Sequence, residues 1–179
     1  MKLFLTLVVS LSCTHGFEIL KNTRHFEANF TQKVRSGDFV YKNYSGHLWY
    51  SDKKVKIVIT VPDTEYVLIK DSTVKTLIPK DSTLIIQKRL RNAGFFFDML
   101  MDPDRMDNSN GDCVATIFPD SSNIDSLKVF FSPHTVKKVT LYQGEIVVDI
   151  SISGFKVHSS LPDSIFQIPH IAGIHTVRF

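Results

Sequence analysis

FEANFTQKV, residues 26–34, alternates apolar and polar side chains from Phe26 to Val34. Because successive side chains of a β-strand point to opposite sides, this alternation predicts a strand with one apolar face. The same period of two recurs in residues 55–60, 127–131, 139–141 and 146–152. Turn-forming residues separate the apolar stretches, at 36–38, 61–63, 79–81, 109–112 and 143–145. The pattern predicts an antiparallel sheet with one apolar face.

Three short segments depart from the alternation and predict helical structure. Residues 17–25 and 93–101 (AGFFFDMLM) each suit a short helix, and the second ends at the helix-stopping pair Asp102-Pro103. Residues 162–166 suit one further helical turn. We find no repeat, low-complexity tract or linker in the 179 residues, which predicts one sheet-based domain.

The first sixteen residues have the order of a secretory signal. Lys2 gives a positive start, residues 3–11 form an apolar run, and small residues, Thr14 and Gly16, stand three residues and one residue before the expected cleavage point. We expect cleavage after Gly16, which leaves residues 17–179 as the single mature domain. No later run is long enough to cross a bilayer as a helix, so we expect an exported, soluble protein of the periplasm.

Lipidation at Cys13 is an alternative fate for this N-terminus. Ser10 stands three residues before Cys13, where a bacterial lipoprotein signal usually has a branched aliphatic residue. Cleavage after Gly16 would instead leave Cys113 as the only cysteine, and hence one buried thiol. Both processing routes stay open at this point.

Charge and motif content exclude several function classes. The formal net charge of +3 is too small to indicate nucleic-acid binding. The seven histidines lack zinc-ligand spacing. Residues 102–112 fail as a calcium loop, since Met106 stands where an oxygen ligand is needed. No nucleophile elbow, P-loop or zinc-protease motif occurs. We therefore predict no enzyme, with no catalytic residue, metal or cofactor.

Several short motifs resemble the LolA family of periplasmic lipoprotein carriers. Residues 26–33 are similar to the family's opening F-x-A-x-F-x-Q strand, and residues 45–50 (SGHLWY) to its second strand. Val61-Pro62 stands where the next strand ends, and residues 164–174 (SIFQIPHIAGI) resemble the closing segment with one extra residue. The motifs span the mature chain in the family's order.

Two stretches depart from the family pattern. After Trp49 the family usually has a basic residue followed by proline, and here residues 51–54 read SDKK. An aromatic pair is usual where residues 75–77 read KTL. These differences concern how a lid is held and how strictly cargo is selected, and they leave the fold unaffected.

The resemblance implies a mainly β (α+β) fold, a curved incomplete antiparallel β-barrel with a few short helices covering the concave apolar face. The implied function is that of a periplasmic chaperone, which carries the acyl chains of lipoproteins from the inner to the outer membrane. Implied partners are acylated lipoproteins, an inner-membrane ABC-type releasing complex and an outer-membrane lipoprotein receptor, and we expect a monomer. Two alternatives are a LolA-like receptor or sensor that does not shuttle cargo, and an enzyme on a β scaffold.

The alternation and the resemblance together single out three sets of candidate residues. The predicted lipid-binding cavity is lined by Phe26, Phe30, Leu48, Ile57, Ile59, Val129, Phe131, Leu141, Val148 and Ile150. The predicted lid consists of Phe95, Phe96, Met99 and Leu100. Candidate partner-docking residues are Lys53, Lys54, Lys137 and Lys138, although basic residues on exposed strands are often only solubilising.

Overall fold

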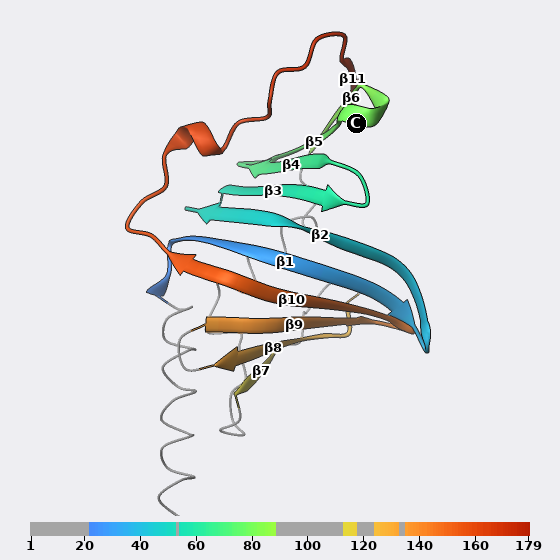
Figure 1. The fold of residues 1–179 in the computed structure, drawn as a ribbon, viewed down its shortest axis with the longest axis vertical. Coiled ribbons are helices and arrows are strands. Elements are labelled where there is room, and N and C mark those ends of the chain that lie inside the picture. The colour runs from blue at the N-terminus through green and yellow to red at the C-terminus, as the bar shows by residue number, and fades with distance from the viewer. Residues whose placement is uncertain (1–21, 53, 89–112, 118–123, 133–134) are drawn as a thin grey trace, which may run out of the picture. The chain divides into compact units, whose positions relative to one another are not determined.

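A computed structural model describes residues 22–52, 54–88, 113–117, 124–132 and 135–179. Eleven strands form one sheet within these ranges, in the order β11-β6-β5-β4-β3-β2-β1-β10-β9-β8-β7 (Figure 1). The strands are β1 (His25–Ser36), β2 (Phe39–Ser51), β3 (Lys54–Val61), β4 (Glu65–Lys70), β5 (Thr73–Ile78), β6 (Thr83–Lys88), β7 (Val114–Ile117), β8 (Ser126–Ser132), β9 (Thr135–Gln143), β10 (Ile146–Val157) and β11 (His175–Arg178). Two 3₁₀ turns, η1 (Pro79–Asp81) and η3 (Asp163–Ile165), accompany them.

The predicted mainly β fold, with a sheet that is not closed into a barrel, is confirmed. Most neighbouring strands whose register is established pair antiparallel, as the short turns require. The exception is β11, which pairs parallel with β6. A long connection, residues 158–174, brings the chain back to this edge, and such a connection allows parallel pairing where a tight turn does not. The predicted antiparallel sheet thus has one parallel pairing, at its last strand.

The chain divides into two compact units, and the three strands β1, β2 and β10 contribute to both. The first unit contains Gln32–Lys42, β7 to β9 and β10 as far as Ser153. The second contains Arg24–Thr31, β2 from Asn43 onward, β3 to β6 and Gly154–Phe179. Each unit has its own buried apolar residues, such as Leu127 in the first and Leu77 in the second, both 0% exposed.

The predicted helical segments have different outcomes. The turn expected at 162–166 is confirmed as η3. Of segment 17–25, residues 17–21 lie outside the described residues, and His25 begins β1. Segment 93–101, with all four lid residues, also lies outside the described residues. Cys113 is half-buried, so the expectation of a fully buried side chain at this position is wrong.

Candidate apolar binding faces

Five predicted cavity residues of the second unit share one face of its strands. Leu48 pairs with Ile57 across β2 and β3, and paired residues project from the same side of a sheet. Ile59 pairs with Gly46, and a Cβ built on Gly46 would lie 3.0 Å from the Phe30 ring. Phe26 stacks on Tyr50, and the two ring centroids are 5.3 Å apart. The five residues of this face are therefore Phe26, Phe30, Leu48, Ile57 and Ile59.

Burial divides these side chains into two groups. Phe26, Phe30 and Leu48 are buried, whereas Ile57 and Ile59 are half-buried. The buried group forms the floor of the face, and the half-buried isoleucines retain surface that an apolar ligand can contact. The list of cavity candidates omits further members of this face: Tyr50, Val55, Val67, Ile69 and Val74. Alternation could not identify those of β4, since EYVLIK is apolar on both sides.

The other five predicted cavity residues share one face of the first unit. Val129 and Val139 pair across β8 and β9, and Val139 pairs with Ile150 of β10. Leu141 pairs with Val148, and Phe131 pairs with Val136 beyond an irregularity in β8. Val129 is fully buried and Phe131 is 8% exposed, whereas the other three are half-buried (Leu141, Val148 and Ile150). This unit also combines a packed layer with accessible apolar side chains.

The candidate docking lysines have different surroundings. Lys54 Nζ lies 2.6 Å from the Asp163 carboxylate and 5.8 Å from the centroid of the buried Phe166 ring. These two contacts connect the η3 region to the start of β3. Lys138 Nζ lies 2.6 Å from Asp149. Lys137 is exposed, and Lys53 lies outside the described residues. Two of the four lysines thus have structural partners.

A polar cluster occupies the opposite side of β2 in the second unit. Trp49 Nε1 donates to Glu27 Oε2 at 3.2 Å, and the Nε2 atoms of His47 and His158 lie 3.6 and 3.5 Å from the same carboxylate. Asn29 Oδ1 lies 2.7 Å from His47 Nδ1 and orients that ring. Both Nε2 atoms are buried and have no hydrogen-bond partner among the residues that the structure describes. Sequence patterning did not identify this cluster, because its members come from β1, β2 and the residue after β10.

His47 and Glu27 both have a lowered pKa in this cluster, for different reasons. Burial lowers the pKa of His47 below its usual 6.5, and the nearby Glu27 carboxylate opposes the effect without cancelling it. Burial raises the pKa of Glu27, but the charges of His158, Lys156 and His47 outweigh it and leave that pKa below 4.5. The folded chain therefore favours a neutral His47 beside an ionised Glu27.

Asp149 is the centre of a second polar cluster, in the first unit. Its carboxylate accepts hydrogen bonds from Thr140 Oγ1 at 2.8 Å and Arg35 Nε at 3.1 Å, in addition to the Lys138 contact. Partial burial raises the pKa of Asp149, but bonds from Lys138, Thr140 and Arg35 outweigh it and leave that pKa below 3.8. Asp149 thereby joins β10 to β9 and β1.

We expect acidification to destabilise the fold in two steps. Unfolded His47 takes up a proton more readily than the folded form, so stability falls as the pH drops below 6.5. Glu27 and Asp149 stabilise the fold fully at pH values above their ordinary pKa values of 4.5 and 3.8. This stabilisation is lost as the pH falls through the lower pKa values that the two carboxyl groups have in the folded chain. Thermal unfolding followed by circular dichroism across this pH range measures both steps. His47→Gln should remove the upper step and leave the Asp149 contribution unchanged, and a melting temperature that is constant or rises on acidification would contradict the assignment.

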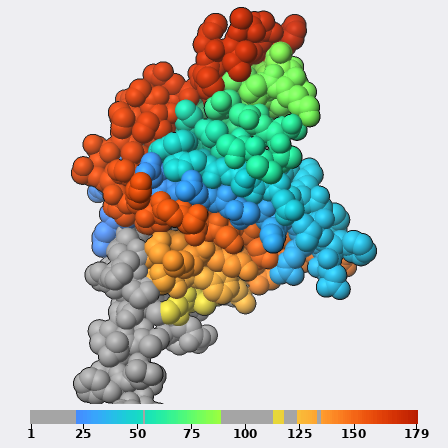
Figure 2. Space-filling model, viewed as in Figure 1, coloured from blue at the N-terminus to red at the C-terminus, as the bar shows by residue number. Residues whose placement is uncertain are grey.

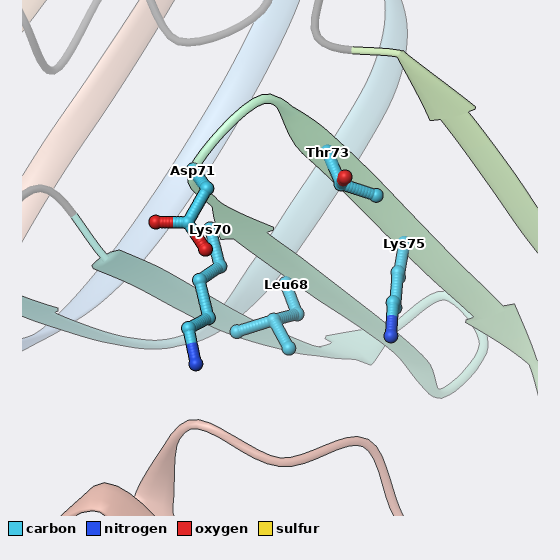
Figure 3. A pocket seen from close by; sticks show the side chains of 5 residues that line it. All are labelled: Leu68, Lys70, Asp71, Thr73 and Lys75. Carbon is cyan, nitrogen blue, oxygen red and sulfur yellow. The ribbon is translucent and has the colours of Figure 1, made fainter.

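A small polar pocket of about 250 Å³ lies along the β4–β5 hairpin of the second unit (Figure 3). It is lined by Leu68, Lys70, Asp71, Thr73 and Lys75. Leu68 and Lys75 are cross-strand partners, and the three long side chains project from the same side of the hairpin. Because Leu68 is the single apolar side chain in the lining, the pocket does not suit an acyl chain.

The described part of the chain contains neither a membrane-spanning helix nor a metal-binding group of side chains. No helix there has the length and apolar character needed to cross a membrane. No group of three or more His, Cys, Asp or Glu side chains within the described ranges is arranged to hold a metal ion.

Comparison with known proteins identifies a shared fold. No protein-family model and no curated protein matches this chain. An uncharacterized conserved protein from Thermus thermophilus superposes with a TM-score of 0.58 at 8% identity, covering 91% of this chain and 95% of that one. A DUF1329 family protein from Desulfovibrio piger gives 0.51 at 11% identity, covering 88% and 95%.

The structural neighbours of this chain include a LolA superfamily protein. That protein, from Nitrosomonas europaea, has a TM-score of 0.48 and 14% identity, covering 89% of this chain and 97% of that one. At these identities the similarity concerns the fold alone.

Proposed function

We propose that this chain binds the acyl chains of lipoproteins on its apolar sheet faces and carries them across the periplasm. The observation behind the proposal is that half-buried aliphatic side chains share a sheet face with buried apolar side chains in each unit. Ile57 and Ile59 do so in the second unit, as do Leu141, Val148 and Ile150 in the first. The LolA-like motifs at residues 26–33 and 164–174 support the same class of ligand.

Partial exposure of these side chains suits a ligand that must later be released. Burial of one methylene contributes roughly 0.8 kcal/mol, so three chains of about fifteen methylenes would contribute ~36 kcal/mol if fully buried. A protein that covered its cargo to this extent would not release it. A face that is only partly accessible contacts part of each chain, and displacement of a lid during binding lowers the net affinity further. Residues 93–101 remain the proposed lid.

The proposed route begins with export and cleavage after Gly16. The mature chain, residues 17–179, receives an acylated lipoprotein from an inner-membrane ABC-type complex and delivers it to an outer-membrane receptor. We propose a monomer that needs no cofactor and catalyses no reaction. Lys137, which is exposed on β9, is the docking residue we propose to test first.

Replacement of a half-buried residue on the face should weaken lipid binding without unfolding the chain. We expect Ile57→Gln to lower the affinity for a fluorescent triacylated peptide by about tenfold, because a polar amide replaces part of the apolar contact. Val58→Gln is the matched control, since Val58 is also half-buried in β3 but projects from the opposite side. Fluorescence titration measures both affinities, and melting curves check both folds. Equal losses for the two variants would contradict the proposed face.

A second candidate is a LolA-like receptor or sensor that binds lipid without ferrying it. The observation that favours it is the β2–β3 turn, where Asp52 has a φ of 44° that proline cannot adopt. The turn therefore differs from the basic-proline form usual in the carrier family. Mass spectrometry of the protein from its host separates the candidates. A mass for residues 17–179 with co-purifying acylated species supports the carrier, and a lipidated Cys13 supports the anchored receptor.

A further inference from the structure

The end of the β1–β2 hairpin exposes an unusual run of apolar side chains. Residues 37–43 are all exposed, and among them Phe39 is 78%, Val40 53% and Tyr41 59% exposed. The strands meet at Gly37, whose φ of 54° is the left-handed conformation that glycine adopts readily in hairpin turns. This end of the hairpin belongs to the first unit.

We propose that this hairpin end, residues 33–42, is a contact site for the interface of an anionic phospholipid bilayer. The inference goes beyond the proposed function, because it concerns a membrane surface and does not require cargo on the apolar faces. It assigns a role to side chains that contribute nothing to the buried core.

The geometry of the run favours lipid over a protein surface. Consecutive side chains of a strand point to opposite sides, so Phe39 and Tyr41 project from one side of the hairpin and Val40 from the other. A protein partner that packs against one side would leave the other in water. A bilayer interface surrounds an inserted hairpin end on all sides and covers both. Backbone pairing between β1 and β2 also limits the number of polar groups that insertion would leave unpaired.

The neighbouring charges match an anionic headgroup layer. Lys33 and Lys42 are both exposed. Lys33 lies on β1, four residues before Gly37, and Lys42 lies on β2, four residues after Asp38. Like charges on facing strands repel each other, and an anionic phosphate between them relieves the repulsion. Asp38 is the one acidic residue of segment 32–42, and Arg35 is occupied by Asp149. Tyrosine next to lysine is also a common composition at membrane interfaces.

A neighbouring strand adds apolar surface at the same end. Arg35 of β1 contacts Asp149 of β10. Counted from this contact, the hairpin turn at Asp38 is three residues further along β1, and Ile146 is three residues further back along β10. Because β1 and β10 are neighbours in the sheet, Ile146 starts β10 close to the hairpin turn. It is 39% exposed. Figure 2 shows this hairpin end, in light blue, as a lobe that no other segment covers in that view.

A tryptophan placed in the hairpin end reports directly on insertion. We expect the emission of Phe39→Trp to shift to shorter wavelength with vesicles of phosphatidylglycerol and phosphatidylethanolamine, and brominated lipid to quench it. Val61→Trp is the matched control, since Val61 is also exposed (48%) but ends β3 in the second unit. Both variants share the native Trp49, whose emission in the unsubstituted chain is the baseline. This local signal is independent of membrane binding by any other part of the chain.

Binding measurements on the same vesicles complete the test. We expect Phe39→Ser with Tyr41→Ser to lower vesicle partitioning by about tenfold, because two aromatic rings no longer enter the interface. Lys33→Gln with Lys42→Gln should cause a loss of about tenfold on anionic vesicles and almost none on phosphatidylcholine vesicles. Unchanged Phe39→Trp emission, equal quenching of the two tryptophan variants, or a serine variant that binds like the unsubstituted chain would overturn the proposal. The Ile57 titration uses no vesicles, so either proposal can fail without the other.

Discussion

Gly46→Ala should unfold the chain or cost about 3 kcal/mol or more of its stability. A Cβ at this position would overlap the backbone carbonyl oxygen of Val58 and lie 3.0 Å from both the Ile59 Cα and the Phe30 ring. The backbone of β3 cannot move aside without breaking its register with β2 and β4. Because small domains have a total stability of roughly 5–15 kcal/mol, a loss of this size is readily measured.

Urea denaturation followed by circular dichroism measures the effect, with Gly144→Asn as the control. Gly144 lies in the turn between β9 and β10, with a φ of 55°, and nothing lies within 4 Å of an added Cβ. Asparagine tolerates this left-handed conformation, so the control should cost less than about 1 kcal/mol. If Gly46→Ala and Gly144→Asn have the same unfolding midpoint, the close approach of β2 and β3 at Gly46 is wrong.

Asp149→Ala should have the second-largest effect, a loss of about 2–4 kcal/mol in the free energy of unfolding. The side chain of Asp149 is 17% exposed and accepts bonds from Lys138, Arg35 and Thr140. Its removal leaves two cations close together and the buried Thr140 hydroxyl without its acceptor. The cost therefore comes from the partners left behind as well as from the bonds lost.

Asp63→Ala provides the comparison, because Asp63 forms an exposed ion pair with Lys80 at 3.1 Å. Exposed pairs typically contribute less than about 1 kcal/mol. Denaturation at neutral pH should separate the two variants clearly, and Asp149→Asn should retain part of the stability through its bond to Thr140. Similar losses for Asp149→Ala and Asp63→Ala would mean that the Asp149 cluster does not stabilise the fold.

Much of the sheet could be predicted from alternation and turn residues. Residues 26–34, 55–60 and 146–152 lie in β1, β3 and β10, and the turns at Gly37 and Gly144 separate strands as predicted. Alternation works where one side of a strand is buried and the other is polar. The five predicted cavity residues of each unit therefore project from one face.

The features that sequence reasoning missed depend on contacts between distant residues. The predicted strands are shorter than β2, whose first residues, Phe39 to Tyr41, are all apolar and exposed. The cluster around Glu27 combines residues from separate parts of the chain, which no local spacing indicates. Parallel pairing of β11 with β6 depends on the path of residues 158–174, and alternation carries no information on strand direction.

The position of β1 in the sheet has a consequence for how the chain folds. One edge of β1 pairs with β2, which follows at once, but the other pairs with β10, which begins at Ile146. In a chain that becomes available from its N-terminus, that second edge has no partner until Ile146 is available. Contacts so distant in sequence slow folding, and an open strand edge attracts other unfolded chains in the meantime. Aggregation before β10 pairs with β1 is therefore a hazard that this strand order creates.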